Sequence, residues 1–319
     1  MRNGKAFEYA IAKEYKNYII QQGRNVTLVE NEAYKQAKGY YDSFSCEEKS
    51  RFDKAAYETI DTMVKIEPGL LAQKDEKDVL SVIMQKDQEG KKGDVRDVVL
   101  SRCSVQWEIG LSAKNNNDAV KHSRLSKTLD FGEAWLHTPC SQTYWDEISP
   151  LFDELHSIRK GNPDAQWSDL DDRKKDDFYV PLLIAFKKEI LYMNDISEHI
   201  PSKLVSYLIG ECPFYKIIKD DAHNMVIVRA FNINGGLNKT VNEVKSRYSI
   251  PQIKLPTRIV EFEFKKGSKD TLNMILDGGW EISFRIHNAS KKVEASLKFD
   301  VRLIGNPPIL FTQHLFQEI

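Results

Sequence analysis

Hydrophobic residues along this chain follow two kinds of spacing, one typical of helices and one typical of strands. Apolar residues recur every three or four positions over residues 5–22, which predicts a helix with Gly23 as its C-cap. Residues 31–65 predict one or two further helices, the second capped by Ser45 at the spacing of a capping box. Pro68-Gly69 ends this helical block.

Shorter apolar runs follow, and their length and β-branched content favour strands. Residues 79–85 form one such run, and a polar, glycine-rich turn comes after it. Residues 97–102 and 105–114 predict two strands joined by a short turn, as in a hairpin. Helical spacing then returns, most clearly over residues 144–158 and 178–193.

After Pro201 the pattern changes again, to a series of short strand-like runs separated by glycine-containing turns. These runs are residues 214–219, 225–231, 257–264, 271–276, 280–287, 296–304 and 309–314. We therefore expect two domains, a helix-rich one over residues 1–205 and a β-rich one over residues 206–319.

Composition supports a folded protein without a membrane anchor. The chain has 319 residues, 41% of them hydrophobic, which is enough for a substantial core. It contains no apolar run of about 18 residues and no secretory leader pattern, so a cytoplasmic protein is expected. The four cysteines (Cys46, Cys103, Cys140 and Cys212) lie far apart, which argues against a zinc site or a disulfide framework.

Charge is unevenly distributed, although the net charge is only −1. Residues 203–319 contain 17 Lys and Arg against 12 Asp and Glu, whereas the preceding residues contain 29 against 35. An acidic part suited to a metal ion and a basic part suited to phosphate would produce this division.

The expected strand pair at 97–114 carries the clearest chemistry. Alternate residues of a strand share a face, so Glu108, Gly110, Ser112 and Lys114 should point one way, while the apolar residues between them face the core. Asp97 begins the preceding strand and could meet the polar face. Carboxylates beside an ammonium can hold Mg²⁺ and activate a water for phosphodiester hydrolysis. The alternative is an edge hairpin with a solvated polar face.

This arrangement resembles the PD-(D/E)xK nuclease signature, in which an Asp is followed by an acidic residue, any residue and a lysine. Here the last element reads Ser112-Ala113-Lys114, so serine occupies the acidic position. Two glutamates are candidates to replace the missing carboxylate. Glu108 lies upstream on the same strand face, and Glu8 lies on the first helix.

At a closer level the chain resembles the HaeIII-type family of restriction endonucleases. The matching stretches, which run over nearly the whole length, are residues 4–10, 93–97, 107–114, 120–126, 135–144, 179–183, 279–290 and 296–301. The resemblance implies an α/β fold with a PD-(D/E)xK nuclease core, a central mixed sheet flanked by helices, and a β-rich C-terminal DNA-recognition portion. It implies a Type II enzyme that uses Mg²⁺ to cut double-stranded DNA at a short palindrome, GGCC for the family's namesake.

The resemblance also implies roles for individual residues. Asp97 would be a metal ligand; Asp94 competes for this role, but the apolar run starts directly after Asp97. Lys114 would position the attacking water or stabilise charge on the phosphorus, and Glu108 or Glu8 would complete the metal site. An activated water would attack in line with the leaving group and leave 5′-phosphate and 3′-hydroxyl ends.

Two basic segments are candidates for contact with DNA. Lys121, His122, Ser123 and Arg124 follow the expected catalytic strand and could contact phosphates; the alternative is an ordinary solvated helix start. Arg285, His287 and Asn288 could reach base edges, and Lys291 and Lys292 suit phosphates; the alternative is a plain amphipathic strand and turn.

The expected partners follow from the implied activity. A palindromic site invites a homodimer, and a restriction-modification system implies a cognate DNA methyltransferase. The missing carboxylate at Ser112 keeps an alternative open, a non-catalytic, sequence-specific DNA-binding protein with a degenerate nuclease core. A structure-specific repair nuclease is a third possibility.

Overall fold

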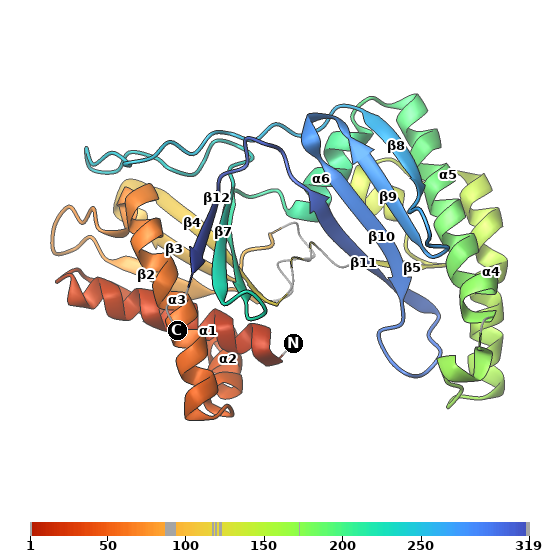
Figure 1. The fold of residues 1–319 in the computed structure, drawn as a ribbon, viewed down its shortest axis with the longest axis horizontal. Coiled ribbons are helices and arrows are strands. Elements are labelled where there is room, and N and C mark those ends of the chain that lie inside the picture. The colour runs from red at the N-terminus through yellow and green to blue at the C-terminus, as the bar shows by residue number, and fades with distance from the viewer. Residues whose placement is uncertain are drawn as a thin grey trace. The chain divides into compact units, whose positions relative to one another are not determined.

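The computed structural model describes residues 2–86, 94–116, 118, 120, 123–171 and 173–316. The chain forms two compact units. Unit 1 comprises Met1–Asp118, Gly210–Lys254 and Ile309–Ile319, and unit 2 comprises Ala119–Ile209 and Leu255–Pro308. Each unit has its own sheet and its own helices (Figure 1). The protein is therefore a mixed α/β protein.

Unit 1 is built on a seven-stranded mixed sheet with the strand order β1-β2-β3-β4-β6-β7-β12. The β1/β2 and β4/β6 pairs are parallel, and the other pairs are antiparallel. Its strands are β1 (Val26–Val29), β2 (Leu80–Met84), β3 (Val98–Arg102), β4 (Trp107–Asn115), β6 (Phe214–Asp220), β7 (Met225–Phe231) and β12 (Thr312–Phe316).

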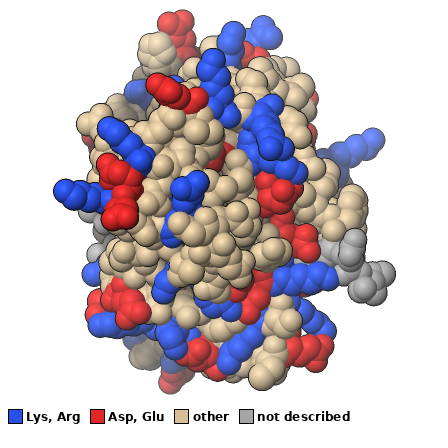
Figure 2. Space-filling view, turned by 90° about the vertical axis from the view of Figure 1, so that its left-hand side faces the viewer, with Lys and Arg blue, Asp and Glu red and all other residues tan. Residues whose placement is uncertain are grey.

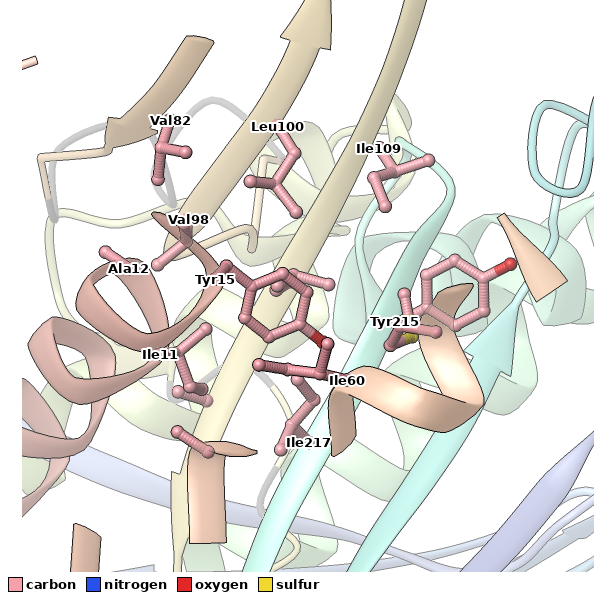
Figure 3. Packing of buried hydrophobic residues seen from close by; sticks show 14 of the residues in the cluster. Ile11, Ala12, Tyr15, Ile60, Val82, Val98, Leu100, Ile109, Tyr215 and Ile217 are labelled. Carbon is pink, nitrogen blue, oxygen red and sulfur yellow. The ribbon is translucent and has the colours of Figure 1, made fainter. Parts of the chain in front are cut away.

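Three helices cover one face of this sheet: α1 (Arg2–Gln21), α2 (Glu32–Asp42) and α3 (Cys46–Ile66). Figure 3 shows side chains of α1 and α3 meeting the inward-facing side chains of β2, β3, β4 and β6. The capping box expected at Ser45 is confirmed, because Ser45 N donates to Glu48 (2.9 Å) and Glu48 N donates to Ser45 Oγ (3.2 Å). Basic and acidic side chains are interspersed over the face drawn in Figure 2.

A buried carboxylate joins the end of α3 to the sheet of unit 1. Glu67 is inaccessible to solvent and accepts hydrogen bonds from Tyr215 Oη (2.5 Å), Asn238 N (2.6 Å) and Trp107 Nε1 (3.3 Å). Burial raises the pKa of Glu67 to about 7, although these three hydrogen bonds oppose the shift. A raised carboxyl pKa means that the folded protein holds this proton over a pH range in which the unfolded chain has lost it.

Glu67→Gln should therefore change how stability depends on pH. In the wild type, Glu67 should lower the free energy of unfolding as pH rises from 4.5 to about 7, and add no further change above that. The fall that this one group contributes should reach about 3 kcal/mol. Urea unfolding of both proteins across this range measures it: the curve of the Gln variant should be shallower, and parallel curves would contradict the assignment.

Unit 2 is built on a five-stranded antiparallel sheet with the order β5-β11-β10-β9-β8. Its strands are β5 (Ser123–Ser126), β8 (Ile259–Phe264), β9 (Thr271–Leu276), β10 (Glu281–His287) and β11 (Ser296–Gly305). Its helices are α4 (Gln142–Gly161), α5 (Val180–Ile196) and α6 (Ile200–Ile209). Phe186 of α5 packs against Phe284 and Phe299, so this helix covers the apolar face of the sheet.

The chain passes between the two units four times, so the units do not follow the single boundary at 205/206 that the sequence suggested. The physical reason is strand pairing. β6 adds to the free edge of β4, β7 adds to β6, and β12 adds to β7, which places three strands from the expected second domain in unit 1. Conversely, β5 lies where helical spacing was expected, because it pairs with β11 far along the chain. No helix among the described residues is long and apolar enough to cross a membrane.

Candidate active site

The expected hairpin is present as β3 and β4, which pair antiparallel with Val98 opposite Leu111. This register places Asp97, directly before β3, opposite Ser112. The alternation along β4 is also as expected. Ile109, Leu111 and Ala113 are buried in the core of unit 1, and the residues between them point away from it.

Asp97 is held by β4 through several contacts to one carboxylate oxygen. Its Oδ2 accepts from Ala113 N (2.8 Å) and from Ser112 Oγ (3.1 Å), and Lys114 Nζ lies 3.7 Å from the same oxygen. Ser112 therefore donates a hydrogen bond to Asp97 from the position where a second carboxylate was expected. The two residues that the sequence singled out most firmly, Asp97 and Lys114, lie side by side.

Glu8 of α1 lies within the electrostatic field of this pair. Its side chain is buried and accepts from Lys5 Nζ (2.9 Å). Burial, and then the nearby carboxylate of Asp97, raise the pKa of Glu8 to about 8, whereas Lys5 and Lys114 lower it. Because α1 packs against β3 and β4, this carboxylate lies close enough to the hairpin for the charges of Asp97 and Lys114 to act on it.

The other two candidate carboxylates, Asp94 and Glu108, are bound to Arg96 instead. Arg96 donates to Asp94 through Nε (2.8 Å) and Nη2 (2.7 Å), and to Glu108 through Nη1 (2.5 Å). A Cβ on Gly110 would overlap the Arg96 side chain, so the glycine makes room for this arginine. Although burial opposes it, the Arg96 hydrogen bonds hold the pKa of Asp94 below its usual range.

The chemistry of this donor set fits a hard cation. Among the described residues, no three or more His, Cys, Asp or Glu side chains gather as a metal site. The Asp97 carboxylate helps to raise the pKa of Glu8, so the two acidic side chains are close enough to interact. Mg²⁺ commonly binds one or two carboxylates and completes its shell with water and substrate phosphate, so a pair of this kind is sufficient.

The polar face of the unit 2 sheet gathers basic residues from three strands. Arg285 on β10 is paired with Asp300 on β11, and both Arg285 and Arg302 lie 3.3 Å from the Asp300 carboxylate. His287 is paired with Lys298, which in turn is paired with Arg124 of β5. Lys298 and Arg302 were missed in the sequence analysis, although the alternation that pointed to β10 continues in β11.

The remaining predicted DNA contacts differ in their surroundings. Arg124 donates to Ser296 Oγ (2.9 Å) and to the Ser296 carbonyl (2.6 Å), and Ser123 shares a hydrogen bond with Tyr207. In the loop after β10, Asn288 accepts from Lys174 (2.8 Å), Lys292 pairs with Asp164 (2.6 Å), and Lys291 is exposed. Lys121 and His122 lie outside the described residues.

Comparison with known proteins identifies the family of this chain. The family model of the HaeIII restriction endonuclease matches residues 4–307, a span that includes parts of both units. The chain therefore belongs to the HaeIII restriction endonuclease family and is an enzyme of the restriction endonuclease class, which confirms the resemblance seen in the sequence. Enzymes of the Type II class generally use divalent metal ions.

A named restriction enzyme is similar to this chain over most of its length. The Type II restriction enzyme HaeIII of Haemophilus aegyptius is 40% identical over 306 residues, which cover 96% of this chain and 94% of that protein. No solved structure matches the chain significantly.

Proposed function

We propose that this protein is a Type II restriction endonuclease that uses Mg²⁺ to hydrolyse double-stranded DNA at a short palindrome, GGCC, leaving 5′-phosphate ends. The proposal rests mainly on one observation: in a chain of this family, Asp97 and Lys114 lie 3.7 Å apart at the start of β3 and the end of β4, and their charges act on the buried Glu8. We assign this arrangement to the PD-(D/E)xK type, with Glu8 in place of the missing carboxylate at Ser112.

Each residue has a defined task in this scheme. A bound Mg²⁺ would supply Lewis-acid stabilisation of the charge that develops on the phosphate. Asp97 and Glu8 would hold the ion, and the hydrogen bonds from Ala113 N and Ser112 Oγ fix the orientation of Asp97 for that role. Lys114, 3.7 Å from Asp97, would orient the attacking water and offset negative charge in the transition state.

Unit 2 supplies a surface suited to DNA. Arg124, Lys298, Arg285 and Arg302 share the polar face of its sheet, where Asp300 is the acidic neighbour of two of them. Clustered Lys and Arg bind backbone phosphates, and Arg in particular pairs with guanine in the major groove. We therefore assign catalysis to unit 1 and DNA recognition largely to unit 2.

The biological setting follows from this activity. A palindromic site favours a homodimer, because two identical active sites then meet two identical half-sites. The same proposal includes a cognate methyltransferase that protects the same sequence from cleavage. It also includes a cytoplasmic location.

A plasmid digest tests the proposed function. The purified protein with Mg²⁺ should convert plasmid DNA into fragments whose ends, sequenced at base resolution, all fall in GGCC and carry 5′-phosphate. The matched controls are the same reaction with a chelator and a plasmid methylated at GGCC. Cleavage at another fixed sequence would support the enzyme class but rule out GGCC as the recognition sequence. Tight, sequence-specific binding without any cleavage would favour the non-catalytic alternative.

A further inference from the structure

A row of polar side chains crosses the unit 1 sheet and begins at Asp97. Ser112 on β4 is paired with Lys216 on β6, and Lys216 is paired with Arg229 on β7. Paired residues on neighbouring strands point to the same face of a sheet. The core residues Tyr215 and Ile217 point the other way, towards the helices. The row therefore runs from the candidate active site across the sheet face opposite the helices, and it contains two cations, Lys216 and Arg229.

The Asp118 carboxylate is hydrogen-bonded to both Lys216 and Arg229. Asp118 accepts hydrogen bonds from Lys216 Nζ and Arg229 Nη1, and Lys216 Nζ also donates to the Asp118 carbonyl (3.2 Å). Lys216 is only 3% exposed, whereas 32% of the Asp118 side chain remains accessible. Burial, together with Lys114 and Arg229, lowers the pKa of Lys216 to about 8, and Asp118 opposes that shift.

One donor of this site is not satisfied by Asp118. Arg229 Nε is buried and has no hydrogen-bond partner among the described residues. The residue at position 112, beside Lys216, is a neutral serine, so it adds no negative charge to the row. Lys114 and Arg229 are both close enough for their charges to act on Lys216, and Asp118 accepts hydrogen bonds from Lys216 and Arg229.

We propose that Lys216 and Arg229 form a binding site for a DNA backbone phosphate beside the scissile one, and that Asp118 occupies this site in the free protein until DNA displaces it. The inference rests on the proposed function and deepens it. A phosphodiester offers two charged oxygens that can accept from Arg229 Nε and Nη together and from the Lys216 ammonium. A cavity of about 320 Å³ lies beside Asp118 and is lined by Asn116, Ile218 and Ile227 as well as by Asp220 and Asp221, so the space next to the Asp118 side chain is not filled by protein.

Asp118→Asn should tighten binding, because it removes the group that competes with phosphate. The dissociation constant for a duplex oligonucleotide, measured without divalent metal, should fall at least about fivefold. Asp221→Asn is the matched control: Asp221 is also salt-bridged, to Lys219, and lines the same cavity, and its loss changes the net charge equally. It should change the constant less than about twofold. Arg229→Gln should weaken binding and reduce the slope of log affinity against log salt by about one.

The outcomes separate this site from the proposed function. Folded Asp118→Asn that binds DNA no more tightly than Asp221→Asn overturns the proposal, and so does an unchanged salt slope in Arg229→Gln if Asp118→Asn fails to fold. Wild-type cleavage of plasmid DNA tests the proposed function by itself. A wild type that cleaves, with no gain in Asp118→Asn, leaves the enzyme assignment in place and removes only this phosphate site.

Discussion

Duplex cleavage should fall by more than about a thousandfold when Asp97 is replaced by alanine, because the candidate metal site then keeps only Glu8. Lys114→Ala should cost about a hundredfold or more, since it removes the cation that offsets transition-state charge. Single-turnover cleavage of plasmid DNA with Mg²⁺ measures both. Both variants should still bind duplex DNA, because the basic face of unit 2 is unchanged.

Asp97→Asn serves as the structural control for these measurements. Its side-chain oxygen can still accept from Ala113 N and Ser112 Oγ, so its thermal unfolding should match the wild type while its cleavage is lost. Near-wild-type cleavage by Asp97→Ala or Lys114→Ala would contradict the site as assigned.

The second large effect is expected at Glu8, because Glu8→Gln should greatly reduce cleavage whereas the same substitution at Glu108 should change it little. Glu8→Gln removes a candidate metal ligand and should lower cleavage roughly a hundredfold, with part of the loss recovered at higher Mg²⁺. Glu108→Gln removes only a half-exposed contact to Arg96 and should leave cleavage within about threefold of the wild type. Cleavage rates over a Mg²⁺ titration distinguish the two.

Both variants change a glutamate carboxylate into an amide of nearly the same shape, so each serves as the control for the other. If Glu108→Gln lost activity and Glu8→Gln kept it, the missing carboxylate would have to be Glu108, released from Arg96 when DNA binds. Equal losses in both variants would argue for a site that uses both glutamates.

The hairpin and the pairing of Asp97 with Lys114 could be predicted from sequence because they depend on local alternation. Which side chains of residues 107–114 face the core follows from the two-residue period of a strand. The two strands pair because the chain reverses within a few residues between them. The choice between Glu8 and Glu108 could not be made in this way. It depends on how α1 packs on the sheet and on Arg96, which binds the other two carboxylates.

Long-range pairing explains what the sequence missed. Ser123–Ser126 is a strand only because residues 296–299 lie beside it, and nothing within four residues specifies that partner. The sequence analysis named Lys216 only as part of the strand-like run 214–219, which contains two lysines. A lysine inside an otherwise buried strand was nevertheless a usable signal, since such a charge is rarely buried without an anionic partner.

Because the chain passes back and forth between the two units, the sheet of unit 1 is completed late during synthesis. The sheet that carries Asp97 and Lys114 gains β6 and β7 only after residue 231 has been synthesised, and it gains β12 only after residue 316. A nascent chain shorter than this has an incomplete sheet with β4 or β7 at its open edge. The strands that carry Asp97 and Lys114 therefore gain their neighbours on one side, β6, β7 and then β12, only after most of these residues have been synthesised.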